Sequence, residues 1–316
     1  LIIEASRTKW GYVSSTIDSF GQVGSGKYRP VFGVLASVVL HLRNLSPLYI
    51  HVIDLSLLIA TAISAGLIVY AITESRQLQL LTAAFTCISR FNWYGQTAVH
   101  GIMELTALSL ALLGILKFIS SIGVKHRRSD LLMGPAAISL AGFTHERYLV
   151  LAFTFVGLSV LMMKDLRYRI MSVSMYIMVI FTNWYIKTFV IGVDYLNGGG
   201  ESPLRGSLGP WILKHYLIAW LQVLGFSNGT NQYFESNSQN LIDNFGVPNS
   251  FVISRWIRML VVLLLATLVI VWRDRDDRNR NPALVVIAAA ASLLVPASTV
   301  ISRIEARWLL GPEVLL

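Results

Sequence analysis

The charged residues best suited to chemistry come just before the first apolar run of the chain. Asp18 is followed by a flexible Gly-Ser-Gly stretch and then by Lys27 and Arg29. A carboxylate at a membrane surface could remove a proton from an acceptor hydroxyl as a general base. The neighbouring cations could stabilise a phosphate leaving group through charge-assisted hydrogen bonds. A solvated loop without chemistry would have the same composition, so the residues alone leave both interpretations open.

Two further polar clusters join or open apolar runs. The second cluster is His145, Glu146 and Arg147, and the third is Arg303, Glu305 and Arg307. Three cation-rich clusters suggest a shared cavity for an anionic head group, if all three lie on one side of a bundle. The alternative is structural, because such charges can pair with their neighbours and simply hold two helices together.

Other ionisable residues fall inside the apolar runs themselves. They are His51, Asp54, His100 and Glu104. Charged groups at membrane depth are costly, so each is either functional or paired for structure. The lone cysteine, Cys87, excludes an internal disulfide and a cysteine metal cluster.

The composition indicates a membrane protein. Hydrophobic residues make up 54% of the 316 residues and charged residues only 14%, against about 25% charged in a typical soluble domain. The net charge is +9, but the basic residues cluster in short loops between apolar runs. This is the pattern of membrane topology, so we expect a lipid bilayer and no nucleic acid as partner.

Ten apolar runs predict an all-α, polytopic transmembrane helix bundle. The clearest spans are Leu48–Thr73, Thr97–Ile119, Arg169–Gly192, Val252–Trp272 and Pro282–Ser298. Shorter runs are Pro30–Leu42, Leu78–Ser89, Leu131–Phe143, Tyr148–Met163 and a final run from Trp308. A span needs about 20 apolar residues, so pairs of the short runs could form broken helices around a cavity.

Three basic loops set the expected orientation. They contain Lys125, Arg127 and Arg128; Lys164, Arg167 and Arg169; and Arg273, Arg275, Arg278 and Arg280. If these loops are cytoplasmic, the three polar clusters lie on the extracytoplasmic side, provided that Trp211–Phe226 does not cross the membrane. That segment mixes aromatic residues with Lys214 and His215, which favours an amphipathic helix in the interface, although an ordinary span stays open.

These assignments divide the chain into four parts. We expect an external loop over 1–29, an N-terminal transmembrane bundle over 30–192, an external loop with the interfacial helix over 193–250, and C-terminal transmembrane helices over 251–316.

Because the sequence begins with Leu1 and stops inside an apolar run, we expect a fragment, with a signal peptide or a first span upstream.

Four motifs in order resemble those of the GT-C class of polytopic glycosyltransferases. Gly26-Lys27-Tyr28-Arg29-Pro30 resembles the Gly-Arg-Tyr-Arg-Pro element that closes their first external loop, and the stretch from Asn44 to Leu55 resembles their Asn-Pro-x-x-Tyr-His-x-x-Asn-Leu element. The stretch Phe143–Leu149 looks like their His-Glu corner. Glu305-Ala306-Arg307-Trp308 is similar to a Glu-x-Arg-Tyr element before a late span.

The resemblance implies a GT-C-like fold and a polyprenyl-phosphate-linked sugar as donor. The sugar would pass to an acceptor of unidentified chemistry on the extracytoplasmic side, in a bacterial inner membrane. In that class an acid of the first external loop is the catalytic base, which points to Asp18. Some members bind a divalent metal ion in this loop, but a single aspartate is too little to assign a metal site.

The predicted mechanism is direct displacement at the sugar. Asp18 would be catalytic, and the donor phosphate would be held by Lys27, Arg29, His145, Arg147, Arg303 and Arg307. Glu146 and Glu305 would orient the arginines, and the Trp211–Phe226 segment would lie beside the lipid tail. Two other classes stay open: a flippase or transporter of lipid-linked sugars, and a glycan polymerase or ligase that uses Asp194–Ser250 as its large external loop.

Overall fold

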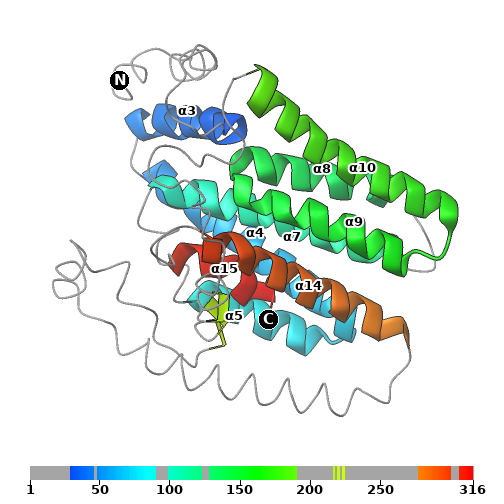
Figure 1. The fold of residues 1–316 in the computed structure, drawn as a ribbon. Helices are drawn as coiled ribbons and strands as arrows, with labels where there is room; N and C mark the ends of the chain where they lie inside the picture. Colours follow the sequence, from blue (N-terminus) through cyan, green and yellow to red (C-terminus); the bar gives the residue numbers. More distant parts are fainter. Residues whose placement is uncertain are drawn as a thin grey trace.

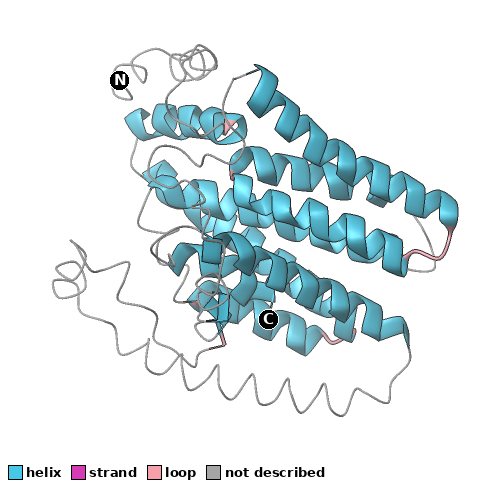
Figure 2. Ribbon diagram, viewed as in Figure 1, coloured by secondary structure: helices cyan, strands magenta, loops and turns pink. Residues whose placement is uncertain are grey.

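The computed structural model describes residues 29–45, 48–89, 99–122, 128–190, 277–299 and 306–315, with scattered positions between 216 and 224. Every element in these ranges is a helix and none is a strand, as the sequence predicts (Figure 2). The long helices lie side by side in one bundle (Figure 1). An apolar backbone segment satisfies its own hydrogen bonds only as a helix, which explains why every apolar run in the described ranges takes this form.

Within the described residues, three helices are long and apolar enough to cross a membrane. They are α4 (Leu48–Thr73), α7 (Val99–Ile122) and α10 (Leu166–Tyr185), which continues into the π-helical turn η4 (Ile186–Val190). Large apolar side chains stay exposed along α4, such as Leu55, which is 57% exposed. α10 exposes large apolar side chains as well, such as Ile177 and Phe181, whereas α7 is mostly buried in the bundle. Long apolar helices with such exposed faces suit lipid rather than water and indicate a membrane protein.

Each shorter apolar run in the described part of the chain also forms a helix. These helices are α3 (Pro30–Leu45), α5 (Arg76–Ile88), α8 (Arg128–Thr144), α9 (Val150–Met162), α14 (Asp277–Thr299) and α15 (Ala306–Leu315). The predicted span Pro282–Ser298 lies within α14. The predicted span Val252–Trp272 lies outside the described residues.

Local sequence signals fix where several of these helices begin and end. The side chain of Ser75 accepts a hydrogen bond from the Leu78 amide and caps the start of α5. Asp165 caps α10 in the same way through the amides of Arg167 and Tyr168. Between α4 and α5, Glu74 takes a left-handed backbone conformation with φ of 56°, which lets the chain reverse direction within two residues.

The centre of the bundle is packed by large side chains and small ones that fit together. The rings of Phe118 on α7 and Phe155 on α9 stack with centroids 4.4 Å apart, and Tyr176 on α10 meets both edge-on. At Gly114 on α7 an added Cβ would lie 2.5 Å from the Ile138 side chain of α8. Glycine therefore allows the two helices to approach closely, as is common between helices in membranes.

Hydroxyl pairs connect neighbouring helices of the bundle, two of them between helices far apart in the sequence. They are Thr61 with Ser109, Ser159 with Ser172, and Thr154 with Ser292, at 2.6 to 2.8 Å. Such pairs satisfy polar groups where water is scarce and fix the register between helices.

The two ends of the bundle differ in charge. The start of α8, the exposed link between α9 and α10, and the start of α14 lie together at the right of Figure 1. These are the described parts of the three basic loops, including Lys164 and Arg167. The turn 145–149, the beginning of α4 and the end of α10 lie toward the opposite end. The positive-inside rule therefore predicts that the basic end is cytoplasmic.

Cysteine labelling tests this orientation in a Cys87→Ser background. Leu48→Cys, at an exposed position that begins α4, should react with a membrane-impermeant maleimide in sealed right-side-out vesicles. Lys164→Cys, in the α9–α10 link, should react only after the vesicles are opened. The same labelling pattern at both positions would contradict a crossing bundle with this orientation.

Candidate functional site

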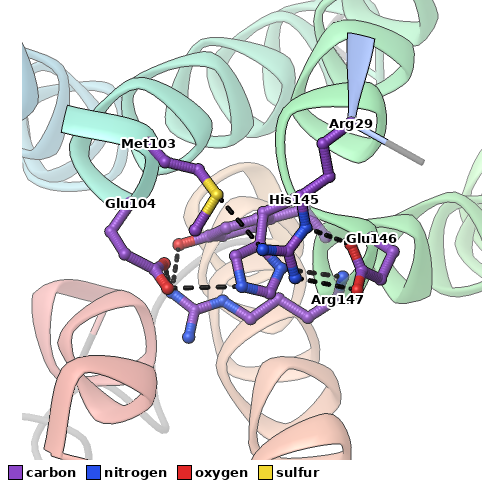
Figure 3. A network of polar contacts seen from close by, with 7 residues as sticks. Arg29, Met103, Glu104, His145, Glu146 and Arg147 are labelled. Atoms are coloured by element: carbon purple, nitrogen blue, oxygen red, sulfur yellow. Dashed lines mark hydrogen bonds and ion pairs between the residues drawn. The ribbon is translucent and has the colours of Figure 1, made fainter. Parts of the chain in front are cut away.

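Ionisable side chains from three separate segments meet around the turn between α8 and α9. Figure 3 shows Arg29, Met103, Glu104, His145, Glu146 and Arg147 in this cluster. Arg29 precedes α3 and Glu104 lies in the second turn of α7, while the other three charged groups belong to residues 145–147. The cluster has a buried inner layer and a partly exposed outer layer.

The inner layer is an ion pair between Glu104 and Arg147. The side chains are only 3% and 8% exposed, and Arg147 Nη2 donates to Glu104 Oε2. The same Nη2 donates to the Tyr148 hydroxyl at 2.9 Å, and the guanidinium carbon lies 4.8 Å from the Tyr148 ring centroid. Arg147 is thus held by a carboxylate and an aromatic ring together, which fixes its position in a poorly hydrated site.

His145 completes the inner layer in a defined tautomer. Its Nδ1 accepts a hydrogen bond from the Arg147 amide at 3.4 Å, and its Nε2 lies 3.3 Å from Glu104 Oε1. A neutral ring with its proton on Nε2 satisfies both contacts. Burial lowers the pKa of His145 from its usual 6.5, and the positive charges of Arg147 and Arg29 act in the same direction against the opposing Glu104. His145 is therefore neutral at pH 7.

The outer layer is a two-point pair between Arg29 and Glu146. Arg29 Nε and Nη2 donate to Glu146 Oε2 and Oε1, each at 2.8 Å, and the side chains are 17% and 28% exposed. Burial alone would raise the pKa of the Glu146 carboxyl, but the hydrogen bonds and charge of Arg29 outweigh it and hold that pKa well below its usual range. Glu146 is ionised at any physiological pH.

Arg29 also has donor capacity that the carboxylate does not use. Its Nη1 donates to Met103 Sδ at 3.3 Å, and a thioether is a weak acceptor. A phosphate oxygen is a far stronger acceptor for the same N–H group. The outer layer could therefore receive an anion without first losing the Arg29–Glu146 pair.

Lys187 brings a third cation toward the cluster. It lies in η4 at the end of α10 and is 5% exposed. The Tyr176 hydroxyl lies close to Gly134 of α8, and α8 and α10 run in the same direction (Figure 1). Lys187 therefore lies toward the same end of the bundle as His145, because each follows the end of one of these parallel helices. Its charge accordingly contributes to lowering the pKa of Glu146.

One turn before Lys187, Asn183 points into the bundle with its amide unsatisfied. It is fully buried, and neither atom of the side-chain amide has a hydrogen-bond partner among the described residues. A buried amide without a partner costs about 1–3 kcal/mol. Asn183 and Lys187 together make the end of α10 polar on its buried side.

The structure brings residues of two of the three predicted polar clusters together. Arg29 meets His145, Glu146 and Arg147, although the residues are separated by more than 100 positions. Glu146 holds Arg29 rather than Arg147, whose carboxylate partner is Glu104. Asp18, Lys27, Arg303 and Glu305 lie outside the described residues, and Arg307 lies in the first turn of α15 with its side chain outside them.

Lys187, Asn183 and Met103 were not predicted from the sequence. Glu104 was noted there only as a costly ion in an apolar run, and His51 and Asp54 as further candidates. Asp54 is 7% exposed with its Oδ1 unsatisfied within the described part of the chain, whereas His51 is exposed.

The segment Trp211–Phe226 is described only in part, and there the Tyr216 hydroxyl donates to the Ala291 carbonyl of α14 at 3.1 Å. Its interfacial position stays a prediction.

Comparisons with protein families, with curated proteins and with solved structures gave no match for this chain. The geometry of the cluster and the sequence motifs therefore carry the functional argument. Within the described residues no group of three or more His, Cys, Asp or Glu side chains is arranged to hold a metal ion.

Breaking the inner pair on one side should destabilise the bundle strongly. Glu104→Gln alone leaves the buried Arg147 charge without its carboxylate, at a cost of about 3–5 kcal/mol. The double variant Glu104→Gln, Arg147→Met should recover most of that loss, because it removes both charges. Thermal unfolding in detergent measures both variants. The matched control pair Lys117 and Asp130, at the basic end, is more exposed, at 26% and 8%, and should show a smaller effect; equal effects at the two ends would contradict this account.

His145 predicts a loss of stability on mild acidification. Its pKa in the folded protein is below the 6.5 of the unfolded chain, so below about pH 6.5 the unfolded chain takes up a proton that the folded chain does not. Stability should then fall with decreasing pH, by at most about 1.4 kcal/mol per pH unit. The Glu146 contribution is not lost in this range, because its pKa is depressed. Unfolding measured at pH 5 to 7.5 should lose this slope in His145→Gln and keep it in the exposed His51→Gln; an unchanged slope in His145→Gln would contradict the assignment.

Proposed function

We propose that this chain is a membrane glycosyltransferase that moves a sugar from a polyprenyl-phosphate donor to an acceptor hydroxyl on the extracytoplasmic side. The observation that carries the proposal is the set of cations at the bundle end away from the basic loops. Arg29 and Arg147 are held there by carboxylates from separate parts of the chain, and the charge of Lys187 acts on Glu146 of the same cluster. The proposed setting is a bacterial inner membrane, which the chain crosses several times.

The charge of the cluster suits an anionic substrate. The described side chains supply three cations against the two carboxylates Glu104 and Glu146, and His145 is neutral. Holding positive charge in a poorly hydrated site is costly, and an incoming phosphate offsets that cost.

The geometry also suits a leaving phosphate. In the proposed reaction the acceptor oxygen attacks the anomeric carbon while the bond from that carbon to the phosphate oxygen breaks. The electron pair leaves with the polyprenyl phosphate, and the acceptor proton passes to a carboxylate, for which Asp18 is the candidate. Arg29 Nη1 would donate to the phosphate, and Glu146 would hold the guanidinium in place.

Two features support this function over the alternatives. The four ordered motifs resemble a glycosyltransferase class, and two of them, around Arg29 and around His145–Tyr148, meet in the structure. Arginines fixed in advance by carboxylates and an aromatic ring suit the stabilisation of a transition state, which requires little reorganisation.

The test is consumption of a purified polyprenyl-phosphate sugar by the protein in liposomes, with membrane extract as the acceptor source. Arg29→Gln should raise the KM for the donor by about tenfold or more, which corresponds to roughly 1.4 kcal/mol. Lys117→Gln, which breaks an ion pair at the opposite end, is the matched control and should retain activity.

The catalytic base is tested in the same assay. Asp18→Asn should abolish product without weakening donor binding, and wild-type rates in this variant would remove Asp18 from the role. If the wild-type protein moves the donor across the bilayer without consuming it, the transporter alternative replaces the proposed function.

A further inference from the structure

The lipid-facing side of α9 and α10 carries an open apolar groove of about 370 Å³. It is lined by Phe153 and Val156 of α9 and by Ile177, Ile180, Phe181 and Trp184 of α10. Phe153 is in the first turn of α9 and Trp184 in the last turn of α10. The groove therefore lies in the half of the bundle that contains the charged cluster.

The last groove residue of α10, Trp184, lies one helical turn before a cation, Lys187, which is buried and does not itself line the groove. Lys187 follows Trp184 by one helical turn and ends the buried stripe of this helix, which runs through Tyr176, Val179 and Asn183. The groove residues occupy the neighbouring stripe. An apolar groove and a buried cation thus follow one another along the end of α10, and the charges of Arg29 and Glu146 act on Lys187.

Aromatic rings mark the level of the membrane surface at this point. Trp184 and Tyr185 are 38% and 47% exposed, and each packs against Phe189 with ring centroids 5.2 and 5.4 Å apart. Tryptophan and tyrosine favour the boundary between hydrocarbon and head groups. A lipid chain lying in the groove would therefore carry its head group at the depth of Lys187.

We propose that the α9–α10 groove holds the first part of the donor's hydrocarbon chain and that Lys187 binds its phosphate. The proposal rests on the proposed function and names the lipid subsite of the same site, in place of the segment Trp211–Phe226 expected from the sequence. From Ile177 to Trp184 the groove runs for roughly 10 Å, at about 1.5 Å per residue. Only the chain nearest the phosphate fits, so a short alkyl phosphate binds nearly as well as a long polyprenyl phosphate.

Trp184 provides a direct readout of this site. The protein is placed in phosphatidylcholine nanodiscs and titrated with dodecyl phosphate brominated near its head group, which quenches nearby tryptophan. The expected result is saturable quenching that disappears in Trp184→Phe. Brominated phosphatidylcholine at the same mole fraction should quench only in proportion to its amount. Equal, non-saturating quenching by both lipids would show that bulk lipid fills the groove and would overturn the proposal.

Three variants separate the groove from the cation. An added Cβ at Gly157, one turn beyond Phe153, meets open space, so Gly157→Phe should fill the groove without disturbing the fold. It should weaken saturable quenching by tenfold or more, while Ile59→Phe on the exposed face of α4 should not. Lys187→Gln should weaken binding to a similar degree and Lys187→Arg should retain it. Unchanged binding in both Gly157→Phe and Lys187→Gln would overturn the assignment.

The transfer assay keeps this proposal distinct from the proposed function. Gly157→Phe should raise the KM for the donor and leave kcat near the wild-type value. Saturable quenching in a protein that transfers no sugar would reject the glycosyltransferase and keep the lipid-phosphate site. Sugar transfer with a normal KM in Gly157→Phe would reject the groove and keep the glycosyltransferase.

Discussion

The buried ion pair between Glu104 and Arg147 is the constraint on which the rest of the site depends. An unpaired charge buried at that position would have a large desolvation free energy, so the two residues must pair. Their side chains are 3% and 8% exposed. Their meeting fixes the start of α7 against the turn between α8 and α9. His145 then fills the remaining side of Glu104 as a neutral ring, because a second full positive charge there would have to be desolvated as well.

The outer pair is of a different kind, because it is partly hydrated and tolerant of an incoming group. Arg29 uses two of its donors on Glu146 and turns a third toward a methionine sulfur. A cation held firmly on one side and only weakly on another is suited to recognise an anion, since the carboxylate sets its position and the weak contact is easily replaced. The buried layer therefore provides rigidity, while the outer layer leaves Arg29 one donor that is held only weakly.

The bundle keeps this arrangement in place by close packing. The stacked rings of Phe118 and Phe155 with Tyr176 tie α7, α9 and α10 together, and Gly114 lets α8 approach α7. The hydroxyl pairs set the register of these helices. Because close-packed helices carry Glu104 and the turn 145–149, these side chains are presented from a stiff scaffold.

The sequence by itself determined the helical class, the existence of α4, α7 and α10, and the charge difference between the two ends, because long apolar runs and basic loops are local features. It also singled out Arg29 and His145–Arg147 through their residue types. Only the tertiary structure decided the partners: Glu104 for Arg147, Glu146 for Arg29, and Lys187 as a charge that acts on Glu146. Such pairings depend on the register of helices distant in the chain, which close packing sets and no local pattern encodes.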